Sequence, residues 1–234
     1  LFYGYVTQGI VQKEDITENG IKYIKRDGSV GYYQTVNKTT PVAGDVKYVD
    51  RNGDGVVDDN DRDIIGNPNP DFTYGFQTKV SWKSLSLSAS FNGVQGRDIL
   101  NVGNRYNNTP GTKSNNVTRK AFQNMWTDEN PSNLYPKSTF VVQNMVMDRY
   151  VEDGSYLRCS DITLSYVLPA KWTNKIGIKN TSVYASVKNA FVITDYSGYD
   201  PEVNSFAFDG LRPGVDMSSF PTPRSFVFGL NLTF

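Results

Sequence analysis

The chain has 234 residues, and its 24 Lys and Arg balance its 24 Asp and Glu, so the formal net charge is zero. This balance argues against nucleic acid as a partner, because nucleic-acid binding requires a basic surface. The absence of His and the presence of only one Cys remove the commonest general base and exclude an internal disulfide.

Residues 1–40 begin with the aromatic, β-prone stretch LFYGYVTQGI. This start lacks the charged residues and the small-residue cleavage site of a signal peptide, so we expect an exported protein to begin upstream of it. Further along, 21–24 and 30–35 predict a short hairpin around the turn residues 26–29.

The segment 43–66 contains a calcium-type loop, DRNGDGVVDDND. Gly55 occupies the sixth position, where an EF-hand loop turns sharply. The loop places oxygen ligands at the spacing that surrounds Ca²⁺, which predicts a structural calcium site. The ligands are the backbone carbonyl of Val56 and the side chains of Asp50, Asn52, Asp54, Asp58 and Asp61. Asp61 is shorter than the usual Glu, as in dockerin-like modules. The alternative is an acidic surface turn that binds no ion.

Five segments alternate between polar and apolar residues, which predicts β-strands: 72–82, 85–92, 156–168, 182–194 and 224–234. The last strand puts Phe226, Phe228, Leu230, Leu232 and Phe234 on one face. The alternation continues through Cys159, which is expected on the polar face of its strand. Such runs, about ten residues long, span a bilayer when tilted, although no apolar run is long enough for a transmembrane helix.

Two long loops separate these strands, 100–154 and 197–223. In the first, 114–126 predicts a helix with Ser114 or Asn116 as its cap. Three aromatic residues stand in polar surroundings there and could contact a sugar or a peptide: Tyr106, Trp126 and Tyr135. The alternative is that these rings pack the loop against itself.

Catalysis is not indicated. The carboxylates have no His, nucleophile motif or apolar setting beside them that would shift a pKa. Asp148, Glu152 and Asp153 cluster before a strand, and a solvated loop explains them. We therefore expect no enzyme and no catalytic residues.

The alternation of strands with short and long connections predicts an all-β fold, an antiparallel transmembrane β-barrel segment with long extracellular loops. In this interpretation, outer-membrane lipid covers the apolar faces. The alternative is a secreted, soluble β-sandwich that binds carbohydrate and uses a dockerin-like calcium loop, in which the apolar faces meet each other.

Four stretches resemble the carboxyl-terminal barrel region of SusC/RagA-type TonB-dependent outer-membrane transporters of Gram-negative bacteria: 44–76, 151–169, 196–203 and 220–234. The resemblance implies a barrel of about 22 strands around an amino-terminal plug. It also implies energy supplied by TonB through the plug, and a SusD-like lipoprotein that captures a glycan or an oligopeptide.

The plug is absent from 1–234, and about six strands cannot close such a barrel. We therefore expect the chain to be the carboxyl-terminal part of a longer polypeptide, or one of two chains that complete a barrel. Its edge strands should pair with the remainder of the barrel, because a membrane does not tolerate unpaired strand edges.

Overall fold

The computed structural model describes residues 1–109, 116–138, 145–173, 178, 180–202, 205–206 and 208–233. The chain divides into two compact units. The sheet unit comprises Asn69–Arg97, Asp153–Val203 and Phe220–Phe234, and the loop unit comprises Leu1–Pro68, Asp98–Glu152 and Asn204–Ser219. Among the described residues, no helix has both the length and the apolar character needed to cross a bilayer.

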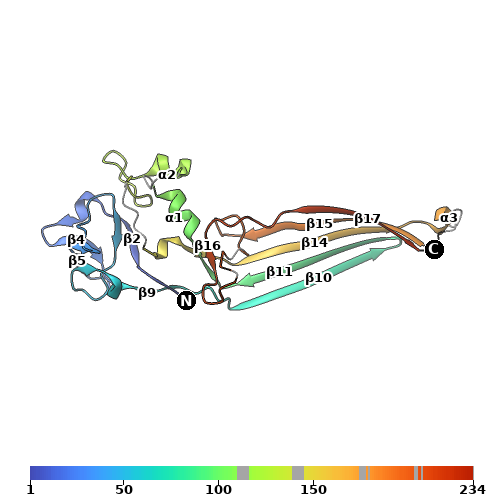
Figure 1. Ribbon diagram of the computed structural model, residues 1–234, viewed down its shortest axis with the longest axis horizontal. Coiled ribbons are helices and arrows are strands. Elements are labelled where there is room, and N and C mark those ends of the chain that lie inside the picture. Colours follow the sequence, from blue (N-terminus) through green and yellow to red (C-terminus); the bar gives the residue numbers. More distant parts are fainter. Residues whose placement is uncertain are drawn as a thin grey trace. The chain divides into compact units, whose positions relative to one another are not determined.

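The sheet unit is built on one antiparallel sheet of five strands, in the order β10-β11-β14-β15-β17. Figure 1 shows these strands side by side. Each has the polar–apolar alternation of a strand with two different faces. The five predicted strands are confirmed, with Phe234 outside the described residues; their bounds are Phe72–Trp82 (β10), Leu85–Gln95 (β11), Tyr156–Val167 (β14), Asn180–Thr194 (β15) and Ser225–Thr233 (β17).

β10 and β11 form a hairpin around Lys83 and Ser84. Their register is unbroken from Phe72 opposite Gln95 to Trp82 opposite Leu85. Lys83 has a φ of 54°, the left-handed conformation that two-residue hairpin turns require. Its ammonium lies 4.9 Å from the centroid of the Trp82 ring, so a cation–π contact compensates for part of that strain.

The apolar face of the sheet is exposed. The side chains of Phe228 and Leu230 on β17 remain 79% and 58% exposed, and Val80 on β10 remains 64% exposed. No second layer covers this face in the described part of the chain, whereas a sandwich would bury it between two sheets. The soluble β-sandwich alternative is therefore not supported.

A β-bulge at Ser160 changes the facing of β14. Cys159 pairs with Phe91 of β11 and with Phe191 of β15, so it lies on their apolar face. The predicted polar facing of Cys159 is wrong, because one extra residue reverses the alternation beyond it. The buried thiol lies beside a row of rings in which Phe76 stacks on Phe91 at 4.6 Å between centroids.

The antiparallel order also sorts the connections by length. The 83–84 turn and the 168–179 connection, which includes α3 (Ala170–Thr173), leave the sheet from one end. The long segments 96–155 and 195–224 leave from the other end. The predicted alternation of short and long connections is confirmed between these five strands.

The described residues of the loop unit form five small sheets. The predicted hairpin is confirmed as β4 (Gly20–Ile24) and β5 (Val30–Tyr33), which β3 (Ile16–Thr17) extends to three strands. The other strands are β1 (Phe2–Gly4) with β9 (Asp63–Gly66), β2 (Thr7–Ile10) with β7 (Val46–Tyr48), β6 (Thr35–Val36) with β8 (Val56–Val57), and β12 (Asp98–Asn101) between β13 (Val151–Asp153) and β16 (Val215–Asp216). None of the described amino-terminal strands joins the five-stranded sheet, so the predicted count of six strands is not confirmed.

A hydrophobic core holds these short sheets together. It contains the buried rings of Tyr5, Tyr33 and Tyr48, and the loop residues Trp126 and Met147 contribute to the same cluster. Tyr5 and Tyr48 pack edge to face at 5.9 Å between centroids. The segment 100–154 is therefore part of a folded unit with a core of its own.

Two α-helices lie in the described part of this segment, where the sequence predicts one. α1 (Val102–Asn108) was not predicted, and α2 (Arg119–Asn124) is shorter than the predicted helix. The N-cap of α2 is Thr118, whose side chain accepts the N–H of Ala121 at 3.1 Å. Asn116 is therefore not the cap, and Ser114 lies outside the described residues.

A buried ion pair fastens the segment after β15 to the sheet. Arg158 of β14 lies 2.5 Å from Asp200, and the two side chains are 5% and 3% exposed. Burial alone would raise the pKa of Asp200, but the N–H groups of Glu202 and Thr222 and the charge of Arg158 together lower it. Asp200 is therefore ionised and fully paired.

We expect a charge at Leu230 to impair assembly of the predicted barrel. Leu230→Lys places an ammonium on the exposed apolar face of β17, at a cost of about 2–4 kcal/mol if it lies at mid-membrane. The matched control Asn231→Lys alters the opposite face of the same strand and should be mild. The folded fraction recovered from membranes measures both variants, and equal losses would contradict this facing.

We expect Arg158→Met to destabilise the sheet unit by about 3–5 kcal/mol, because it leaves Asp200 charged and buried without its partner. The control is Lys188→Met in the exposed pair with Asp161, where Lys188 is 54% exposed and the loss should be about 0–1 kcal/mol. Limited proteolysis of segment 195–202 and denaturant unfolding measure the difference. Similar effects of the two variants would show that burial does not decide the strength of these pairs.

Candidate functional site

The loop 50–61 is folded by the side chain of its first residue. Asp50 is 2% exposed, and its two carboxylate oxygens accept the N–H groups of Gly53 and Gly55 at 2.7 and 2.8 Å. Gly55 has a φ of +87°, and a Cβ at this position would lie 2.3 Å from Gln34 Oε1. The conformation therefore requires glycine at the sixth position, and a side chain there would also displace the amide of Gln34.

The last residue of the loop closes the turn. Asp61 is 0% exposed, and its carboxylate accepts the N–H groups of Arg51 and Asp58 at 2.7 and 2.8 Å. The hydroxyl of Tyr23 donates to the carbonyl of Asp50 at 2.6 Å. Burial, followed by the charges of Asp50 and Asp61, raises the pKa of Tyr23 to about 12, so this donor keeps its proton at neutral pH.

The remaining predicted ligands bond to one another. Asn52 Nδ2 donates to Asp54 Oδ2 at 2.9 Å, and the N–H of Val56 donates to Asp54 Oδ1 at 2.8 Å. Within the described residues, no three Asp, Glu, Cys or His side chains are grouped closely enough to hold a metal ion. Calcium binding would thus require these oxygens to turn from their present donors toward the ion.

The buried charges favour a cation all the same. Burial raises the pKa of Asp50 although the two glycine N–H groups lower it, and Asp61 and Asp54 raise it further. Neither Asp50 nor Asp61 forms an ion pair with a side chain in the described ranges. The loop therefore concentrates negative charge that backbone dipoles alone offset.

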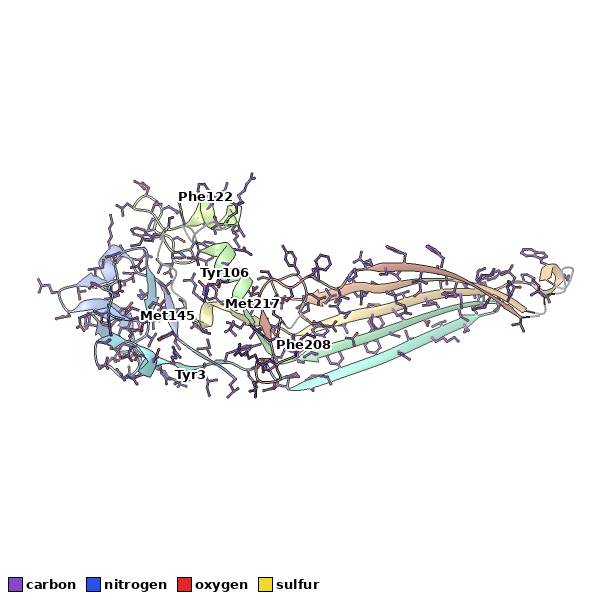
Figure 2. All side chains as sticks on the ribbon, in the orientation of Figure 1. Tyr3, Tyr106, Phe122, Met145, Phe208 and Met217 are labelled. Atoms are coloured by element: carbon purple, nitrogen blue, oxygen red, sulfur yellow. The ribbon has the colours of Figure 1, made fainter. Side chains whose placement is uncertain are left out.

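The three aromatic residues predicted to contact a ligand do not form one surface. Trp126 and Tyr135 are buried, and the N–H of Trp126 donates to the carbonyl of Tyr135 at 3.0 Å. The indole N–H of Trp126 donates to Gln12 Oε1 at 2.9 Å, deep in the loop unit. Tyr106 is half-buried on α1 (Figure 2). The Arg105 guanidinium lies over its ring, 4.7 Å from the centroid. The two buried rings pack the segment, and neither is placed to stack on a ligand from solvent.

The acidic cluster before β13 has structural contacts. Asp148 accepts the N–H and the hydroxyl of Thr7 at 3.1 and 2.6 Å. Glu152 accepts the side-chain amides of Asn101 and Asn104 at 3.0 and 3.1 Å. These bonds join distant segments of the loop unit.

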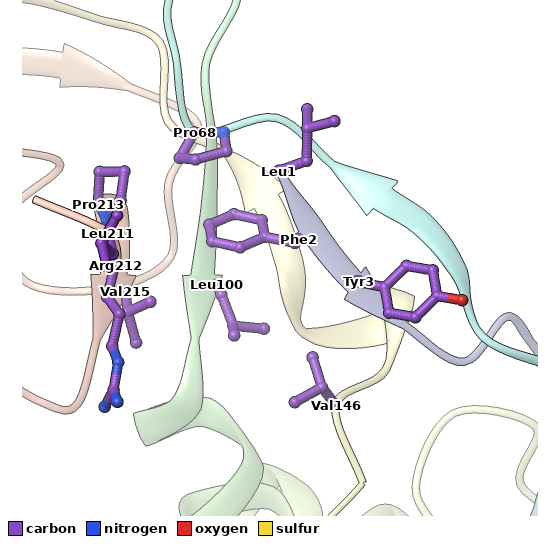
Figure 3. Close-up of a pocket in the computed structure, with 10 residues that line it drawn as sticks. All are labelled: Leu1, Phe2, Tyr3, Pro68, Leu100, Val146, Leu211, Arg212, Pro213 and Val215. Atoms are coloured by element: carbon purple, nitrogen blue, oxygen red, sulfur yellow. The ribbon is translucent and has the colours of Figure 1, made fainter. Parts of the chain in front are cut away.

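Described residues of the loop unit line two cavities that the sequence did not indicate, among any others. One, of about 200 Å³, is largely apolar, and Figure 3 shows Phe2 between Pro68 and Leu100 in its lining. The other, of about 370 Å³, is lined by Val6, Gln8, Ile24, Lys25, Arg26, Val49, Arg51 and Asp63. Their lining residues are too far apart in the chain for sequence spacing to reveal them.

Comparisons with known proteins identify relatives over most of the chain, although no protein-family model matches it. TonB-dependent receptor P26 of Formosa agariphila is 34% identical over 201 residues, which cover 82% of this chain and 20% of that protein. TonB-dependent receptor P3 of the same organism is 32% identical over 238 residues, 100% of this chain and 22% of that protein. TonB-dependent receptor SusC of Bacteroides thetaiotaomicron is 34% identical over 194 residues, 80% of this chain and 17% of that protein.

Solved structures agree with these relatives. The RagAB peptide importer in the open-open state matches with a TM-score of 0.67 and 25% identity, over 100% of this chain and 22% of that chain. Its closed-closed state matches with a TM-score of 0.68 and 24% identity, over 100% of this chain and 23% of that chain. The chain spans about a fifth of the length of the relatives that it matches. With these relatives and its strand architecture, the chain belongs to the SusC/RagA-type family of TonB-dependent receptors.

Proposed function

We propose that this chain is part of a SusC-like TonB-dependent transporter that imports oligosaccharides or peptides across the outer membrane. The observation that carries the proposal is the exposed apolar face of the five-stranded sheet, which suits lipid as its solvent. Family membership supports it, since TonB-dependent receptors are outer-membrane β-barrel proteins and not enzymes. The RagAB structures, described as those of a peptide importer, favour peptide among the substrates.

The rest of the transporter supplies the parts that a sheet of five strands lacks. The free edges of β10 and β17 pair with the remainder of the barrel, which encloses a plug that TonB engages. The long segments that build the loop unit lie on the extracellular side, where a SusD-like lipoprotein would meet them. The SusC and RagAB relatives support this assembly.

We also propose a structural calcium ion at the loop 50–61. Support comes from two buried carboxylates, those of Asp50 and Asp61. Neither forms an ion pair with a basic side chain in the described part of the chain. An ion held by these groups together with Asn52, Asp54 and the carbonyl of Val56 would offset their mutual repulsion. Its role would be to stiffen the loop.

Uptake by intact cells tests the transport proposal. Cells that carry the full-length receptor and its lipoprotein should accumulate labelled oligosaccharides or oligopeptides, and cells without TonB should not. The expected difference arises because release of the plug needs energy from TonB. Equal accumulation of every tested substrate with and without TonB would contradict the proposal.

Chelation tests the calcium proposal. Removing calcium from the full-length receptor should speed proteolysis within 50–61, because repulsion between the carboxylates would loosen the turn. Adding calcium back should restore protection, and magnesium should not. A control site in the 26–29 turn should be cut at the same rate throughout. An unchanged digestion pattern in 50–61 would show that the hydrogen bonds alone hold the loop.

A further inference from the structure

The 370 Å³ cavity of the loop unit has a composition that points to a ligand. Its volume falls within the range of about 300–1,000 Å³ that is usual for ligand sites. Three of its lining side chains are cationic, Lys25, Arg26 and Arg51, and one is a carboxylate, Asp63. The lining therefore carries a net charge of two positive in a chain whose overall charge is zero.

Two of the cations are available. Arg51 is engaged with Asp63 at 2.8 Å, but Lys25 and Arg26 form no ion pair with any side chain in the described ranges. Asp27, which follows them in the hairpin turn, accepts the N–H and the hydroxyl of Ser29 at 2.9 and 2.6 Å, and these bonds lower its pKa more than the nearby charge of Lys25 does. Lys25 and Arg26 can therefore pair with an anion from solution.

The walls of the cavity are fixed before a ligand arrives. The N–H of Ile24 donates to Gln8 Oε1 at 2.9 Å, and Gln8 Nε2 donates in return to the carbonyl of Ile24. These two bonds fasten the end of β4 to β2. On the other side, the N–H of Arg51 is held by Asp61. A preformed site of this kind loses little conformational entropy on binding.

The apolar part of the lining is aliphatic. Val6, Ile24 and Val49 supply it, and none of the described residues that line the cavity is an aromatic on which a sugar ring could stack. Aliphatic side chains beside unpaired Lys and Arg suit a peptide that carries both a carboxylate and an aliphatic group. Charge-assisted hydrogen bonds from Lys25 and Arg26 would hold the carboxylate.

We propose that this cavity binds an acidic segment of an oligopeptide, with a Glu or Asp carboxylate on Lys25 and Arg26 and a neighbouring aliphatic side chain against Val6, Ile24 and Val49. The proposal rests on the transport function, since it names the class of peptide that the receptor recognises. It adds a site and a charge preference to that function.

Peptide binding to the purified full-length receptor tests this proposal. The probes are octapeptides of alternating Glu and Val, of alternating Gln and Val, and an oligogalacturonate of equal charge to the acidic peptide. We expect the acidic peptide to bind about tenfold more tightly than the neutral peptide at low salt, and added NaCl to weaken only the acidic peptide.

The double variant Lys25→Gln/Arg26→Gln should remove most of this preference, so that the acidic and neutral peptides bind with about equal affinity. The matched control is Lys22→Gln, which alters an exposed lysine of β4 outside the cavity lining and should change nothing. Equal affinity for the acidic and neutral peptides would overturn the proposal, as would equal effects of the two sets of substitutions. Tighter binding of oligogalacturonate than of the acidic peptide, reduced by the same double variant, would overturn the choice of peptide.

Binding to the purified receptor requires neither TonB nor a membrane. A receptor that binds the acidic peptide but imports nothing in the uptake assay would overturn the transport proposal and support the cavity. A receptor that imports peptides without any preference for acidic ones, in binding or in uptake, would overturn the cavity proposal alone.

Discussion

The structure depends on the contact between one apolar sheet face and its surroundings. In water, the exposed rings and aliphatic groups of β10 and β17 would carry a large hydrophobic penalty. A second protein layer would remove it, and none covers this face in the described residues. Hydrocarbon removes it equally well, and the antiparallel strands satisfy their backbone hydrogen bonds within the sheet. Membrane lipid thus takes the place that a second protein layer would occupy on the apolar face of this sheet.

The loop unit buries its apolar residues in a core of its own. Its residues come from three segments that are separated by the strands of the sheet unit, and the first two of them share one buried core. Together they enclose a cluster of tyrosines, with Trp126 and Met147 contributed by the long segment before β13. This unit has an aqueous exterior and an apolar interior, the reverse of the lipid-facing sheet.

Polar contacts connect these segments at a few buried points. Asp50 and Asp61 close a turn by accepting backbone N–H groups. Tyr23 of the neighbouring hairpin donates its hydroxyl to the carbonyl of Asp50 in this turn. In the sheet unit, Arg158 fixes Asp200 in the same way, although there the charge is balanced by a charge. The contrast between these sites explains why a cation is plausible at the first and unnecessary at the second. It also shows how short, irregular segments acquire a defined conformation without regular secondary structure.

The sequence by itself determined the five long strands, the apolar face that Phe228 and Leu230 share, and the hairpin of β4 and β5, because alternation and local turn signals are properties of neighbouring residues. It indicated the family through the resemblance of four stretches to SusC/RagA-type transporters, and not through alternation. It also located the loop 50–61 from its spacing. Only the tertiary structure decided that Cys159 faces the apolar side. The β-bulge at Ser160 reverses the facing of the residues before it, and it is visible only in the pairing of β14 with its neighbours. Only the tertiary structure, likewise, buried Trp126 and Tyr135 and brought Lys25, Arg26 and Arg51 around one cavity. Such contacts join residues far apart in the chain, and their distances follow from packing, which no local pattern encodes.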